Sequence, residues 1–136
     1  MSLTPHGPGF SFLDEFVVTE PGKRGTGRKF LDPALPFFAD HFPGEPLMPA
    51  VLLIEAAAQA AGALWASTLA AGAPKRFALA QVAQFKVQQP VRPGSTVETN
   101  VTLDQLLGSL AQFSVTLRVG GEEVALGRLV LSAPAN

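Results

Sequence analysis

The sequence predicts an α+β domain in which antiparallel strands cover one long, buried helix. Three observations predict this fold class: a continuous apolar segment over residues 49–71, about four segments of alternating polarity after it, and a length of 136 residues, which fits one domain. A sheet with one apolar face can bury such a helix, and this combination of layers is typical of α+β proteins.

The composition restricts the class of protein. Hydrophobic residues make up 47% of the chain and charged residues 15%, and the net charge of −1 provides no basic surface for a nucleic-acid backbone. The chain has no cysteine, which excludes disulfides, thiolate nucleophiles and sulfur-ligated zinc. We therefore expect a cytoplasmic protein that does not bind nucleic acid.

The first residues differ in character from the rest of the chain. The segment MSLTPHGPG lacks the basic-then-apolar order of a secretory signal and is rich in turn-forming residues. We therefore expect residues 1–11 to be a disordered leader and residues 12–136 to be a single domain. Because a mobile segment cannot hold a catalytic group in place, we expect His6 to be inert.

Before the long helix, the sequence predicts a hairpin and a rigid loop. Residues 12–20 and 27–31 are two extended segments that could pair across a turn at Pro21-Gly22. Residues 32–49 contain five prolines, which exclude a continuous helix or a central strand. We expect an ordered loop there.

The apolar segment from Pro49 to Ala71 predicts one long helix. A proline suits its first turn, and Gly72 followed by Pro74 suits its end. A membrane-spanning helix is the alternative, but alanine is only weakly apolar and three polar residues interrupt the run, Gln59, Ser67 and Thr68. We therefore expect a helix buried inside the protein, without membrane association.

After the helix the polarity alternates with a period of two, which predicts strands. One face of residues 77–87 carries Phe77, Leu79, Gln81, Ala83, Phe85 and Val87. Residues 97–103 and 111–119 alternate in the same way, and a turn at Gly108-Ser109 separates them. Gly120-Gly121 then predicts a hairpin with a last strand over residues 122–131.

Glu55 is the first candidate for chemistry, because it is the only charged residue between Glu45 and Lys75. A carboxyl group buried without a cation has a raised pKa, so it would be protonated near neutral pH and could donate a proton. The alternative is that Glu55 and Gln59, one turn later, form a polar stripe that faces solvent or makes a structural hydrogen bond.

His41 and the start of the helix are the other candidates. His41 precedes a rigid Phe-Pro-Gly turn, as a positioned base requires, although a loop histidine can also be structural. The first backbone N–H groups of the helix, at Ala50 and Val51, have no obvious side-chain cap, so they could bind a thioester oxygen as it gains charge, unless water or Glu45 binds them. A base, an acid and such donors fit proton abstraction beside a thioester carbonyl with loss of a β-hydroxyl group. No metal or redox cofactor is implied.

At these residues the sequence resembles the β-hydroxyacyl-acyl carrier protein dehydratase family of hotdog-fold enzymes. The resemblance extends from about Phe12 to Ser132, and its most specific part is an ordered set of motifs: His41-Phe42-Pro43-Gly44, then Pro46-Leu47-Met48-Pro49, then Glu55, then Ala58-Gln59. It implies a hotdog fold with His41 as the catalytic histidine, Glu55 as the catalytic acid, and Gly44 and Gln59 in supporting positions. The acid is glutamate in the branch that only dehydrates, so Glu55 implies dehydration without isomerisation.

The resemblance also implies partners. The substrate would be a 3-hydroxyacyl chain on acyl carrier protein, and the enzyme a dimer or a trimer of dimers in which the histidine of one subunit meets the acid of the other. A local basic bias would suit the acidic carrier protein, although a solvated basic surface is the alternative; its residues are Lys75, Arg76, Lys86 and Arg92. The chain departs from the family pattern at Ala50, where glycine is usual, and we expect the methyl group to narrow the approach of the thioester.

Two other functions remain open at this point. In a thioesterase of the same fold, Glu55 would activate water, but this reading leaves His41 without a role. A non-catalytic acyl-binding subunit could also keep the motif, and Ala50 is the residue that best supports that alternative.

Overall fold

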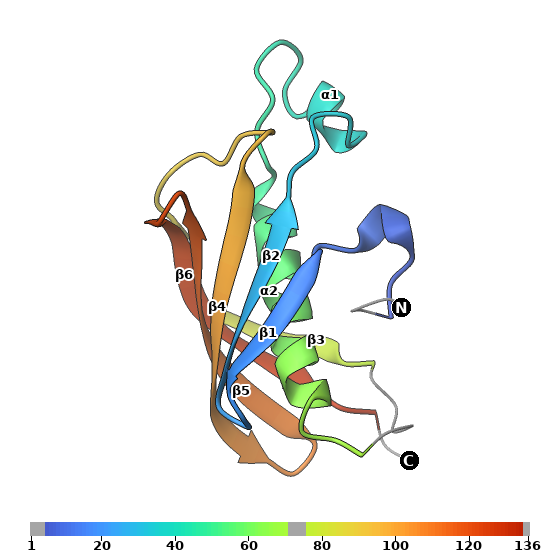
Figure 1. Ribbon diagram of the computed structural model, residues 1–136, viewed down its shortest axis with the longest axis vertical. Coiled ribbons are helices and arrows are strands. Elements are labelled where there is room, and N and C mark those ends of the chain that lie inside the picture. Colours follow the sequence, from blue (N-terminus) through green and yellow to red (C-terminus); the bar gives the residue numbers. More distant parts are fainter. Residues whose placement is uncertain (1–4, 71–75, 135–136) are drawn as a thin grey trace.

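The computed structural model describes residues 5–70 and 76–134. These residues form a 3-10 turn, two helices and six strands (Figure 1). In chain order they are η1 (Pro8–Phe10), β1 (Glu15–Glu20), β2 (Arg24–Phe30), α1 (Phe37–Asp40), α2 (Ala50–Ala66), β3 (Ala78–Val87), β4 (Thr96–Leu107), β5 (Leu110–Val119) and β6 (Glu122–Ser132).

The six strands form one antiparallel sheet in the order β1-β2-β4-β5-β6-β3. Helix α2 runs along one face of this sheet and contacts all six strands (Figure 1). This arrangement confirms the predicted hotdog fold, an antiparallel sheet around one long central helix. Its two edges are β1 and β3.

The core forms because the alternation of the strands matches the apolar surface of α2. Strands β4 and β5 bury alternate side chains, and in the register of the sheet Val101 lies opposite Val115 and Leu103 lies opposite Phe113. On α2 the buried residues include five with a relative exposure of 1% or less, Leu53, Ala57, Ala60, Ala61 and Leu64. Within the described residues, no helix has the length and hydropathy to cross a membrane.

The hairpins follow the predicted turns. β1 pairs with β2, and β5 pairs with β6 through Gly120 and Gly121. These two glycines have φ values of 60° and 83°, the left-handed region that a tight hairpin turn requires and that side chains other than glycine rarely adopt.

Helix α2 ends at Ala66, earlier than expected. Two hydroxyl groups bind carbonyl oxygens of the last turn of the helix: Ser67 Oγ donates to Leu64 O, and Thr68 Oγ1 donates to Trp65 O at 2.7 Å. Such side-chain bonds compete with continued helix. The end expected at Gly72 and Pro74 lies outside the described residues.

Strand β3 corrects the prediction of a strict alternation over residues 77–87. Its pairing with β6 shifts register twice, and Gln84 has a φ of 53° within the second shift. Leu79 precedes both shifts and Val87 follows both, and these two side chains, expected on the apolar face of the strand, are each 42% exposed.

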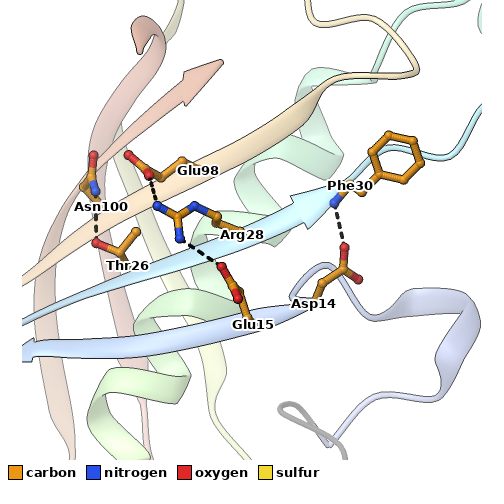
Figure 2. A network of polar contacts seen from close by, with 7 residues as sticks. All are labelled: Asp14, Glu15, Thr26, Arg28, Phe30, Glu98 and Asn100. Atoms are coloured by element: carbon orange, nitrogen blue, oxygen red, sulfur yellow. Dashed lines mark hydrogen bonds and ion pairs between the residues drawn. The ribbon is translucent and has the colours of Figure 1, made fainter. Parts of the chain in front are cut away.

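A polar network on the outer face holds the first strands in register (Figure 2). Arg28 on β2 lies between Glu15 on β1, at 2.9 Å, and Glu98 on β4, at 2.8 Å. Hydrogen bonds to Glu15 and then Glu98 raise the pKa of the Arg28 guanidinium above its ordinary value. At the end of β2, the backbone N–H of Phe30 donates to Asp14, which fixes the point where the N-terminal segment leaves the sheet.

Candidate functional site

The loop that carries His41 extends past the end of the sheet between α1 and α2 (Figure 1). Two reciprocal backbone hydrogen bonds, of 3.1 and 2.9 Å, join Phe42 and Glu45 and close a tight turn. Gly44 has a φ of 78° in this turn, a conformation that favours glycine. This conformation explains why the turn has a glycine at the position where a supporting residue was expected. The turn supplies the rigidity that was expected around His41.

His41 is held by the backbone of its own loop. Its Nδ1 lies 3.1 Å from the carbonyl oxygen of Leu47, and the Leu47 N–H donates to the His41 carbonyl at 2.7 Å. A carbonyl oxygen only accepts, so the neutral ring carries its proton on Nδ1 and has a free lone pair on Nε2. The Phe42 ring stacks on the imidazole with a centroid distance of 4.1 Å. Leu47 is a site residue that the sequence did not reveal, because it acts through its carbonyl and not its side chain.

The start of α2 offers two backbone donors. The helix begins at Ala50 without a side-chain cap, and the first helical hydrogen bonds are those of Leu52 and Leu53 to the Pro49 carbonyl. Among the described residues, the N–H groups of Ala50 and Val51 have no hydrogen-bond partner, and the Val51 side chain is 70% exposed. These donors, at the positive end of the helix dipole, can bind an oxygen that gains charge.

Glu55 lies one turn further along α2, and its side chain is 23% exposed. The Gln59 carboxamide donates to Glu55 Oε2 at 2.8 Å. Gln59 itself is 5% exposed, donates to the Phe10 carbonyl at 2.8 Å and accepts from the Phe12 N–H at 2.7 Å. Three hydrogen bonds therefore fix the Gln59 side chain beside Glu55, and its supporting role stays a prediction.

The N-terminal segment, residues 5–12, lies against this part of α2. A disordered leader was expected over residues 1–11, but residues 5–11 differ from that expectation because Gln59 binds the Phe10 carbonyl and the Phe10 ring packs on Phe12. His6, expected to be inert, has its Nε2 3.5 Å from Glu55 Oε2. Residues 1–4 lie outside the described part of the chain, so the domain bounds stay a prediction.

His41 and Glu55 are not joined within one chain. Among the described residues, His41 makes its side-chain hydrogen bond to Leu47, and the groups within reach of Glu55 are Gln59 and His6. No cluster of three His, Asp or Glu side chains suited to a metal occurs in residues 5–70 and 76–134.

The three basic candidates that the structure describes are not in one place. Lys75 lies outside the described residues, and the other three are exposed. Arg76 precedes β3 and Lys86 is near its other end, so ten residues of extended chain separate them by roughly 30 Å. Arg92 follows Val91, whose carbonyl accepts the Met48 N–H at 2.7 Å, so Arg92 is next to the segment that links His41 to α2.

Comparison with solved structures supports the fold. The dehydratase heterocomplex ApeI:P from Xenorhabdus doucetiae superposes with a TM-score of 0.80 at 18% identity, covering 98% of this chain and 90% of that one. A protein described as a putative thioesterase from Ralstonia eutropha gives a TM-score of 0.66 at 15% identity, covering 86% of this chain and 80% of that one. At these identities the likeness shows the fold alone.

Sequence comparison gives the family. A chain from Rickettsia bellii named 3-hydroxyacyl-(acyl-carrier-protein) dehydratase FabZ is 38% identical over 125 residues, covering 92% of this chain and 86% of the relative. A chain of the same name from a Roseiflexus species is 33% identical over 132 residues, covering 97% and 92%. The family model described as a FabA-like domain matches residues 4–128, so this chain, with its hotdog fold and its His41 loop, belongs to the FabA-like domain family.

Proposed function

We propose that this protein is a 3-hydroxyacyl-acyl carrier protein dehydratase that forms trans-2-enoyl thioesters in fatty acid or related acyl-chain biosynthesis. The observation that carries this proposal is the bond between His41 Nδ1 and the Leu47 carbonyl, which leaves Nε2 as a base at the end of a rigid loop. In a thioesterase of this fold Glu55 would activate water, which leaves the fixed imidazole of His41 without a role. The names of the relatives at 33–38% identity support the same reaction.

In the proposed reaction, His41, the two N–H groups of the helix start and Glu55 each have one role. Nε2 of His41 takes a proton from the carbon next to the thioester carbonyl, and the N–H groups of Ala50 and Val51 bind the carbonyl oxygen as it becomes negative. The carboxyl group of Glu55 donates its proton to the leaving 3-hydroxyl group, which departs as water. A double bond forms between the two carbons, and proton transfer from His41 to Glu55 through solvent restores both groups.

We place each active site between two subunits. Within one chain no hydrogen bond or ion pair of the described residues joins His41 to Glu55. The edge strand β3 is ten residues long and exposes apolar side chains, Leu79, Val82 and Val87, and exposed apolar edges of this kind are normally covered in folded proteins. A second copy would cover this edge and bring its own His41 to Glu55. Light scattering tests whether the assembly is a dimer or a trimer of dimers.

We propose that the acyl carrier protein docks beside the His41 loop. Arg92 follows Val91, which binds the Met48 N–H just before α2, and Lys86 lies six residues before Arg92 at the same end of β3, whereas Arg76 precedes the other end of that strand. The Arg92→Glu variant, which reverses one positive charge, should therefore raise KM for an acyl carrier protein substrate but not for a short thioester without the carrier. The Arg76→Glu variant, with the same change of charge, is the matched control, and an equal effect there would contradict this placement.

One assay separates the candidate functions. Incubation with a 3-hydroxyacyl-acyl carrier protein should increase the absorbance of the conjugated enoyl thioester, and His41→Ala and Glu55→Gln should each reduce this rate at least about a hundredfold while the fold remains intact. Release of free thiol would instead show hydrolysis, and neither product would show a binding protein. The cytoplasmic location stays a prediction that cell fractionation can test.

A further inference from the structure

We propose that His6 is a positioning residue for Glu55, and that the contacts of Phe10 and Phe12 with Gln59 hold it in place. The expected kinetic effects rest on the proposed function, whereas the contacts that support this proposal do not depend on the substrate. It assigns a role to a histidine that the dehydration steps above do not use.

The first observation is the convergence of two nitrogen groups on one oxygen of Glu55. Gln59 Nε2 lies 2.8 Å and His6 Nε2 lies 3.5 Å from Oε2. A protonated carboxyl group carries its proton on one oxygen, and donors directed at Oε2 favour the proton on Oε1. The two side chains therefore leave Oε1 as the oxygen that holds the reacting proton.

The second observation is that hydrogen bonds to Gln59 anchor the N-terminal segment close to Glu55. Gln59 binds the backbone of both Phe10 and Phe12 while it donates to Glu55, so one buried side chain links the segment to the acid. The His6 ring also packs on Phe10, with a centroid distance of 5.6 Å. The position of His6 is therefore linked to that of Glu55 through Phe10 and Gln59.

The Glu55 carboxyl group has few polar neighbours. Among the described residues, His6 is the only titratable side chain within 4.0 Å of it, and Gln59 and the Phe10 and Phe12 backbones are neutral. In the proposed dimer, the partner's His41 faces the same carboxyl group. His6 should therefore hold the Glu55 carboxyl group in one orientation toward the site.

The kinetic test compares three variants of the full-length protein. His6→Ala removes the nitrogen, His6→Gln keeps a neutral N–H donor, and Gly7→Ala perturbs the same segment where a Cβ meets no atom within 4 Å. With a 3-hydroxyacyl-acyl carrier protein, we expect His6→Ala to lower kcat about tenfold, or ~1.4 kcal/mol, with KM nearly unchanged. His6→Gln should restore kcat, and Gly7→Ala should match the wild type.

Equal losses in His6→Ala and Gly7→Ala, or a change confined to KM, would overturn the proposal. A second measurement does not depend on activity. The protein has two histidines, so the NMR signals of the His6 ring can be resolved from those of His41, and Glu55→Gln should shift the His6 signals because the contact with the carboxyl group is changed. Unchanged His6 signals in an enzyme that dehydrates would reject the role of His6, whereas shifted signals in a protein without dehydratase activity would reject only the proposed function.

Discussion

Replacement of Gln59 by leucine, a side chain of similar size, should destabilise the protein strongly. The side chain is 5% exposed and makes three hydrogen bonds, to the Phe12 N–H, the Phe10 carbonyl and Glu55. The buried Phe12 N–H would lose its acceptor at about 1–3 kcal/mol, and the two other bonds contribute about 0.5–1.5 kcal/mol each. Burial of the more apolar leucine offsets part of this loss, at about 1 kcal/mol.

We therefore expect Gln59→Leu to lower the free energy of unfolding by about 2–4 kcal/mol in urea denaturation. Gln105→Leu is the matched control, because Gln105 is exposed on β4, and it should change stability by less than about 0.5 kcal/mol. The N-terminal segment should also become susceptible to proteolysis in Gln59→Leu alone. If the two variants have the same stability, the bonds of Gln59 do not hold the segment on α2 and the reasoning is refuted.

Three further predictions concern single positions. Ala50→Gly should raise kcat/KM or leave it unchanged, since the methyl group narrows the approach of the thioester, and a large loss in steady-state kinetics would show that the alanine is needed. Gly127→Ala should destabilise the protein by about 1–3 kcal/mol in thermal unfolding, because its Cβ would lie 2.8 Å from the Cα of Phe85 on β3; an unchanged Tm would mean that β3 is held loosely. The kcat/KM profile should be bell-shaped, because His41 must be neutral while Glu55 is protonated, and a rate that rises throughout the alkaline range would exclude Glu55 as the acid.

The sequence predicted the parts of the fold that local polarity determines. Strand β4 alternates from Val97 to Leu103 and β5 from Ala111 to Leu117, and α2 is apolar on nearly every side, so these features were visible in the order of residues. Strand β3 was only partly predictable. Its second register shift occurs where Phe85 packs closely over Gly127 of β6, and that contact is between residues 42 positions apart.

The candidate site was predictable to the extent that it depends on side chains near one another in the chain. His41, Gly44, Glu55 and Gln59 lie within nineteen residues and form a motif. The Leu47 carbonyl was missed because every residue has one, and only the path of the loop gives it a role. The contact of His6 with Glu55 was missed because it depends on Gln59 binding backbone groups almost fifty residues away, which leaves no pattern in the sequence.

The most direct test of the account is complementation between two inactive variants. His41→Ala and Glu55→Gln chains with different affinity tags are co-expressed, and dimers that carry both tags are purified. Such a dimer has one site with both changes and one site with neither, so it should form the enoyl thioester at about half the wild-type rate, although each variant alone is at least about a hundredfold slower. Mixed dimers that are no faster than the separate variants would show that His41 and Glu55 do not form a dehydratase site across two subunits.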